Sequence, residues 1–201
     1  MTKAETTGAA APSGAATYDS SAQAAHWLVA ALAVITIPLG WAIAGAPRNT
    51  PQRDLLLLLH RSAGLAILAA MVFRIGWRWH RPPPPLPPVL ARSEIALARI
   101  THFVLYLFLI LIPLAGYLNA AAAGHAVDFF GVVSIPPLLS ENDRLLQVAI
   151  ASHLVAQYPL YLFIALHIAG ALFHGTIRAM GSSSGCYRYV APASRCLCLP
   201  G

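Results

Sequence analysis

Four long apolar stretches dominate the chain, and short segments rich in proline, glycine or charge separate them. The stretches run from about 22 to 46, 54 to 79, 93 to 122 and 145 to 180. A helix needs about 20 residues to cross the hydrocarbon layer of a bilayer, and every stretch is at least that long. The pattern predicts an all-α integral membrane protein built as a four-helix bundle.

The segments between the stretches carry residues that end helices. Residues 47–51 form a short turn, and residues 81–88 contain four consecutive prolines, which lack the N–H that a helix interior needs. Residues 124–144 combine glycine, proline and acidic side chains. Three further prolines lie inside the stretches, where membrane helices tolerate them and bend: Pro38, Pro113 and Pro159. No internal repeat is evident in the sequence.

The composition agrees with a membrane protein. Hydrophobic residues make up 58% of the chain and charged residues 10%, whereas about 25% of the residues of a soluble domain are charged. The net charge of +6 comes from 13 Lys and Arg against 7 Asp and Glu. In so apolar a chain, positive charge is expected at the ends of membrane spans and does not indicate nucleic-acid binding.

Three parts are expected along the chain. Residues 1–17 are rich in Ala, Gly, Ser and Thr without an apolar core, which argues against a signal peptide and predicts a disordered cytoplasmic extension. Residues 18–180 form the transmembrane domain, and residues 181–201 form a cytoplasmic tail. The tail holds three thiols that suit a reducing compartment and whose role is left open: Cys186, Cys196 and Cys198.

Lysine and arginine are distributed unevenly between the two sides. The N-terminal segment, the second loop with its flanking helix ends and the C-terminal segment carry nine of them, and the opposite side carries four. Cytoplasmic loops of membrane proteins carry an excess of Lys and Arg. Both termini are therefore expected in the cytoplasm, so that the first and third helices run outward and the second and fourth run inward.

Histidines recur in the stretches and near their ends. Ionisable groups inside a membrane are costly and usually functional, although a single one is more often a packed, hydrogen-bonded side chain. Their joint pattern favours a functional site. The six positions are His26, His60, His102, His153, His167 and His174.

His153 and His167 lie on the same face of the fourth stretch at two depths. The 14 residues between them span about 21 Å of helix and turn through about 1400°, within about 40° of four full turns. His60 starts the second stretch at the outer level of His153, and His26 starts the first at the inner level of His167. The spacing predicts an outer pair, His60 with His153, and an inner pair, His26 with His167.

Paired imidazoles on facing helices are natural axial ligands for haem iron, and helical bundles hold cofactors between inward-facing side chains. Two pairs therefore predict two haem b groups between the helices. Zinc favours a compact tetrahedral cluster, often with thiolates, and no cysteine lies near these histidines in the sequence. The chain lacks a Cys-x-x-Cys-His motif, which excludes covalently attached c-type haem.

Small residues and an arginine accompany the histidines. Gly64 lies one turn after His60, and Gly40 and Gly116 face inward near the outer level. Such residues admit a flat macrocycle close to the backbone, and they serve plain helix packing equally well. Arg74 lies 14 residues after His60, at the inner level. It is either a partner for a haem propionate or an arginine that extends to the membrane surface.

These motifs together resemble the bacterial cytochrome b-561 family of four-helix di-haem proteins. The resemblance covers roughly residues 18 to 178. It rests on residues 18–27 with their His-Trp pair, 59–64, 102–106, 113–116, 153 and 166–174. It implies that the haem ligands are His26, His60, His153 and His167, and that the protein lies in the bacterial inner membrane. The N-terminal extension and the cysteine-containing tail depart from the family pattern.

Free-standing members of that family are similar to a superoxide oxidase, which takes electrons from superoxide outside and reduces ubiquinone. We expect Arg48, Arg53 and Arg61 to attract the superoxide anion to the outer haem. Quinone reduction also needs protons, and His174 and His102 are the candidate quinone contacts and proton donors. The expected partners are superoxide, ubiquinone and membrane lipid, without nucleic acid and without an obligate protein partner.

Other functions remain open at this point. An electron-transfer subunit of a hydrogenase or dehydrogenase would share the fold and haems, although such subunits often carry a further span. A haem-free proton channel or transporter would use the histidines as a relay, but four helices without broken-helix repeats argue against a transporter. A purely structural bundle would not need histidines paired at matched depths.

Overall fold

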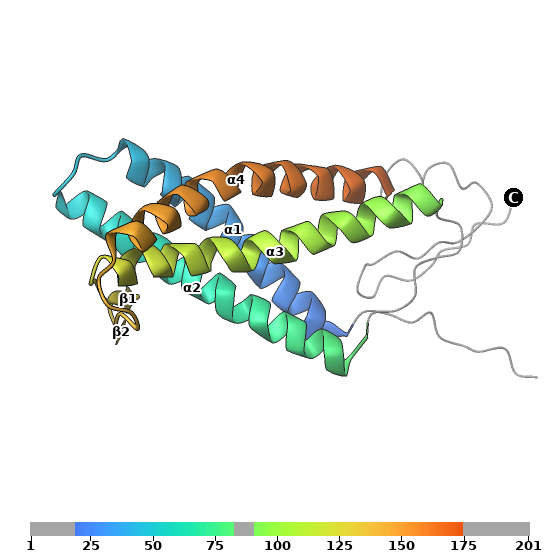
Figure 1. Cartoon of the computed structure of the whole chain (residues 1–201). Helices are drawn as coiled ribbons and strands as arrows, with labels where there is room; N and C mark the ends of the chain where they lie inside the picture. The colour runs from blue at the N-terminus through green and yellow to red at the C-terminus, as the bar shows by residue number, and fades with distance from the viewer. Residues whose placement is uncertain (1–18, 83–90, 175–201) are drawn as a thin grey trace, which may run out of the picture.

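Four long helices make up most of the computed structural model, which describes residues 19–82 and 91–174 (Figure 1). They are α1 (Ser20–Gly45), α2 (Pro51–His80), α3 (Arg92–Ala122) and α4 (Asp143–Leu172). All four are long and apolar enough to cross a membrane. The prediction of an all-α transmembrane four-helix bundle is confirmed, and the first three helices begin and end within a few residues of the expected positions. The fourth begins close to its expected start and ends at Leu172, before the expected end near residue 180, part of which lies outside the described residues. The predicted extension, residues 1–17, and the tail, residues 181–201, lie outside the described residues.

Local capping fixes where the helices begin. The side chain of Thr50 accepts a hydrogen bond from the backbone N–H of Arg53, and Pro51 occupies the first turn of α2, where no N–H is needed. Asn142 caps α4 in the same way by accepting from the N–H of Leu145 at 2.8 Å. The three prolines inside the apolar stretches do not end their helices, which continue past them.

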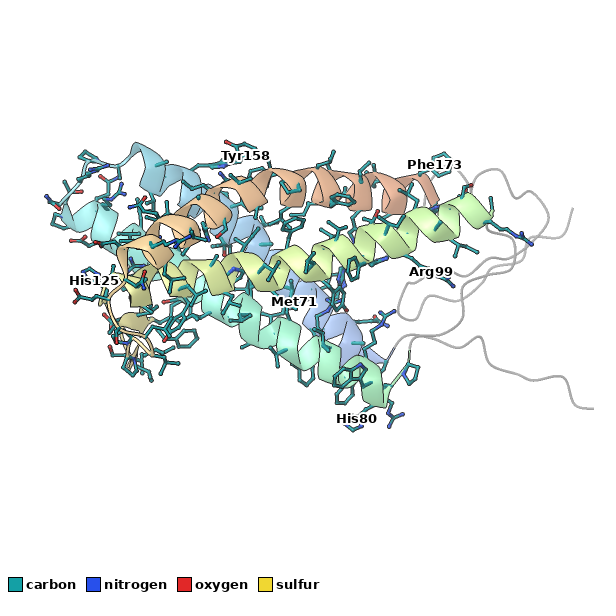
Figure 2. The ribbon with its side chains drawn as sticks, viewed as in Figure 1. Met71, His80, Arg99, His125, Tyr158 and Phe173 are labelled. Atoms are coloured by element: carbon teal, nitrogen blue, oxygen red, sulfur yellow. The ribbon has the colours of Figure 1, made fainter. Side chains whose placement is uncertain are left out.

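The helices associate as two antiparallel pairs. α1 packs along α2, α3 packs along α4, and contact between α2 and α3 joins the pairs. Met71 of α2 is the centre of the apolar core between the pairs, with Val29 and Ile67 beside it and Tyr106 of α3 against it (Figure 2). Many large apolar side chains face outward, among them Phe103 and Val155, as expected for helices surrounded by lipid.

Side chains, and not close backbone packing, connect α1 with α4 in the described part of the chain. Near the C-terminal end of α1, the Trp41 indole N–H donates to the Tyr161 hydroxyl at 3.2 Å, and this hydroxyl donates to Gln157 at 2.9 Å. At the other end of α1, the Trp77 indole N–H donates to the Asp19 carboxylate at 2.8 Å, which fixes the start of α1 to the end of α2.

A short β-hairpin, which the sequence pattern did not predict, follows α3. Strands β1 (Val127–Phe129) and β2 (Val133–Ile135) pair antiparallel around a turn at Gly131, which has a positive φ of 71°. The hairpin projects sideways from one end of the bundle, next to α2 (Figure 1). Ser62 of α2 holds it there: the hydroxyl contacts the Asp128 carbonyl at 3.2 Å and accepts from the Phe130 N–H at 2.7 Å.

Candidate functional site

The four central histidines form two pairs at two levels of the bundle. The imidazole centroids of His60 on α2 and His153 on α4 lie 6.0 Å apart. Those of His26 on α1 and His167 on α4 are also 6.0 Å apart. The structure thus brings together the residues that the helical spacing pairs. We call His60 with His153 the outer pair, because it lies toward the hairpin end, and His26 with His167 the inner pair.

The separation within each pair suits a metal ion between the rings. With metal–nitrogen bonds of about 2.0–2.1 Å and centroids about 1.1 Å beyond the nitrogens, two axial imidazoles have centroids about 6 Å apart. Both pairs, at 6.0 Å, meet this condition. The donor set is purely imidazole, which fits bis-histidine haem ligation.

Backbone carbonyls fix the tautomer of the outer pair. The Nδ1 atom of His60 lies 3.1 Å from the Thr36 carbonyl oxygen, and that of His153 lies 2.9 Å from the Ile112 carbonyl oxygen. A carbonyl oxygen only accepts, so Nδ1 carries the proton and donates in both rings. The Nε2 lone pair is then free for a metal, which is the usual arrangement of a metal-binding histidine.

Two glycines allow these hydrogen bonds to form. A Cβ atom on Gly40 would lie 3.3 Å from Cε1 of His60, and one on Gly116 would lie 3.3 Å from Cε1 and Nδ1 of His153. Each glycine follows the accepting carbonyl by four residues, one turn of helix. Because Gly40 and Gly116 have no side chain, the imidazole rings of His60 and His153 can approach the backbones of α1 and α3. Gly64, also named as a cofactor-binding candidate, faces α3 instead: a Cβ added there would lie 4.0 Å from Cβ of Pro113.

The inner level gathers one polar side chain from each helix. The His102 ring on α3 lies 5.1 Å from that of His167, and its Nδ1 donates to the Ala98 carbonyl at 2.7 Å. Arg74 on α2 is close enough to act electrostatically on both His26 and His167. The structure therefore places Arg74 and His102 at the level that the spacing predicts for them.

The wider comparison agrees with this geometry. The family model for prokaryotic cytochrome b561 matches residues 17–183. The chain belongs to the prokaryotic cytochrome b561 family. Membership implies haem b binding and electron transport, and the four membrane-spanning helices make this cytochrome a multi-pass protein of the inner membrane.

Two relatives of this cytochrome b561 chain cover most of its length. It is 30% identical over 184 residues to cytochrome b561 homolog 2 of Escherichia coli strain K12, which is 85% of this chain and 94% of the relative. It is 32% identical over 149 residues to the probable superoxide oxidase CybB of Yersinia pestis, which is 74% of this chain and 83% of the relative.

The pairing of the helices shows that the 14-residue intervals in the sequence recur in both halves of the cytochrome. In both helix pairs a histidine precedes an inward glycine by 14 residues, and an outer histidine precedes an inner polar residue by 14. The first pair carries His26, Gly40, His60 and Arg74; the second carries His102, Gly116, His153 and His167. The two helix pairs thus share one spacing, with Arg74 in the place that His167 takes in the second pair and with connecting loops of different length.

The three arginines expected near the outer haem have different surroundings. Arg48 is exposed in the turn after α1. The Arg53 guanidinium donates to the carbonyls of Ile43 and Ala46, the latter at 3.0 Å, and thereby caps the end of α1. Arg61, next to His60, is half-buried near the carboxylate of Asp128. Its role, like that of the other two, remains a prediction.

Other residues at the site were either placed differently or missed. His174, a candidate quinone contact, is exposed at the end of α4 against Phe173, with ring centroids 5.4 Å apart. Tyr106, which the sequence did not single out, accepts hydrogen bonds from the Arg74 guanidinium at 3.3 and 3.4 Å. Its position one turn after His102 was the available signal. Ser62 was also missed, because its partners belong to a hairpin that the pattern did not predict.

Proposed function

We propose that this cytochrome is a superoxide oxidase that carries two haem b groups and delivers electrons to ubiquinone. Two superoxide anions lose one electron each and become O₂, and one ubiquinone takes up both electrons and two protons to become ubiquinol. The observation that carries the proposal is the pair of imidazole sites with metal-compatible spacing, stacked along α4 at two depths. The likeness to the probable superoxide oxidase of Yersinia pestis supports the choice of donor.

The histidines hold the cofactors in this proposal. His60 and His153 bind the outer haem, and His26 and His167 bind the inner one. Haem at each level supplies a one-electron acceptor and donor. Held between two imidazoles, each haem would exchange single electrons without binding O₂ at its iron. Arg74, at the inner level, is the candidate partner for a propionate.

Positive charge near the outer pair suits an anionic donor. Arg48 is exposed, and Arg61 lies half-buried beside His60. The N–H groups of Arg53 bind carbonyls at the end of α1. Together these arginines raise the local concentration of superoxide and its rate of encounter, an effect that weakens as ionic strength rises.

The inner end of the bundle is the proposed quinone side. His102 contacts His167 directly. His174 is exposed about two turns after His167, just past the end of α4. An imidazole exchanges protons near neutral pH, so either side chain suits proton delivery to a reduced quinone. The excess of Lys and Arg supports a cytoplasmic position for this end and for both chain termini in this proposal. The reaction needs superoxide, ubiquinone and the lipid bilayer, and no obligate protein partner.

The test is direct reduction of the purified, haem-loaded protein by a superoxide source, followed by absorbance. We expect superoxide to reduce the haems faster than manual mixing can follow, seen as a change in the absorbance spectrum. Added ubiquinone should then reoxidise the haems, and the complete reaction should release oxygen. An Arg48→Gln/Arg61→Gln double variant should slow reduction about tenfold at low salt and less at high salt. If superoxide leaves the haems oxidised, the oxidase proposal is wrong, and a docking role beside a soluble dehydrogenase replaces it.

A further inference from the structure

The outer and inner histidine pairs differ in the groups that face their Nδ1 atoms. Both outer rings donate to backbone carbonyls, His60 to Thr36 at 3.1 Å and His153 to Ile112 at 2.9 Å. Within residues 19–82 and 91–174, neither His26 nor His167 has a hydrogen bond of this kind. The two pairs share the same centroid spacing and yet have different surroundings.

The charges near the two pairs also differ. At the inner level, Arg74 acts on His26 and His167, and its guanidinium binds the neutral hydroxyl of Tyr106. At the outer level, Arg61 acts on His60, and the carboxylate of Asp128 partly offsets its charge. Ser62 keeps that carboxylate near by contacting the Asp128 carbonyl. The inner level therefore carries the less compensated positive charge.

Both differences act on the iron in the same direction. An imidazole that donates its Nδ1 proton to a carbonyl is a more basic ligand, which stabilises the oxidised metal and lowers its reduction potential. A nearby positive charge that is not offset disfavours the oxidised metal and raises the potential. The outer pair has the two carbonyls and an arginine that Asp128 offsets, and the inner pair has Arg74, which binds a neutral hydroxyl.

We propose that this chain makes its outer haem site the lower-potential site and its inner haem site the higher-potential site, so that an electron received outside moves inward downhill. Thr36 and Ile112 lower the outer potential through their carbonyls, Asp128 lowers it by offsetting Arg61, and Arg74 raises the inner one. The inference rests on the two-haem arrangement of the proposed function. It does not depend on superoxide as the donor.

Gly40 offers a way to weaken one of these hydrogen bonds. Alanine at this position would put a Cβ 3.3 Å from Cε1 of His60, so the ring must withdraw from the Thr36 carbonyl. Gly45 on the same helix is a matched control, because an alanine Cβ there would meet nothing within 4 Å. Asp128→Asn removes the negative charge of an exposed hairpin residue and leaves the packing between the helices unchanged.

The experiment is a redox titration of the haem-loaded protein in nanodiscs, with absorbance and electron paramagnetic resonance at each potential. We expect two one-electron steps separated by at least a tenfold preference, or ~59 mV. Gly40→Ala and Asp128→Asn should raise only the lower step, Arg74→Gln should lower only the higher step, and Gly45→Ala should move neither.

The outcomes separate this inference from the proposed function. Two unresolved steps, or a Gly40→Ala or Asp128→Asn shift in the higher step, would overturn the proposed order of potentials. Should Gly40→Ala fail to fold, Asp128→Asn and Arg74→Gln still decide between the two orders. Potentials in the proposed order without reduction by superoxide would leave the inference standing and remove the oxidase. Potentials in the reverse order, together with intact superoxide turnover, would remove this inference and leave the oxidase proposal standing.

Discussion

At the residue scale, the site depends on contacts between an imidazole on one helix and the backbone of its neighbour. Gly40 and Gly116 open the space, and the carbonyls of Thr36 and Ile112 receive the ring protons. Backbone atoms, and not other side chains, therefore orient the imidazoles of the outer pair. Loss of a contact that orients a metal ligand typically costs about 10–100-fold in metal affinity or activity.

Gly116→Ala should weaken binding of the outer haem. The new Cβ would lie 3.3 Å from both Cε1 and Nδ1 of His153, and overpacking of this kind costs about 1–3 kcal/mol, or roughly a tenfold to hundredfold loss of haem affinity. Haem content after extended dialysis measures the loss. Gly170→Ala on α4, where an added Cβ meets nothing within 4 Å, is the control. Equal haem retention by the two variants would contradict the proposed role of Gly116.

At the element scale, the helices were predictable and the hairpin was not. Long apolar runs with proline-rich breaks determine spans, and the interval of 14 residues from His153 to His167 determines face and depth. The hairpin depends on Ser62, fully buried on α2, which is distant in sequence. The carbonyls of Thr36 and Ile112 were equally beyond reach, because any residue supplies a carbonyl and only packing shows which one accepts.

Ser62→Ala should release the hairpin while leaving the helices intact. The variant leaves the Phe130 N–H without its acceptor, and an unsatisfied group of this kind costs about 1–3 kcal/mol. Hydrogen exchange in residues 127–135 should quicken by roughly tenfold or more. Ser152→Ala is the control, since that hydroxyl bonds only to carbonyls of its own helix, Val148 and Ala149. Unchanged exchange in the hairpin of Ser62→Ala would show that other contacts hold it.

At the scale of the whole molecule, two similar helix pairs form one membrane bundle with histidine pairs at two depths. The apolar surface of the helices fits a bilayer, and the hairpin marks one end, with His125 at that end and His80 at the other (Figure 2). The expected orientation, with both termini in the cytoplasm, rests on the Lys and Arg excess and stays a prediction. The direction of electron flow in the account depends on it.

Thiol labelling tests that orientation. A membrane-impermeant maleimide should label Val132→Cys in intact cells, because this hairpin side chain is 84% exposed at the outer end. The native cysteines, at positions 186, 196 and 198, should react only after lysis, because the C-terminus is expected in the cytoplasm. The parent chain with all three cysteines replaced by serine serves as the background. The opposite labelling pattern would reverse the orientation and place the outer pair toward the cytoplasm.

The most direct test of the central claim is the haem-to-protein ratio of purified wild-type protein, His153→Ala and His26→Ala, measured with the low-spin signals in electron paramagnetic resonance. The account predicts two low-spin haems in the wild type and one in each variant, with a different signal lost in each. A wild-type protein with a single haem, or variants that lose the same signal, would contradict two separate imidazole-held sites.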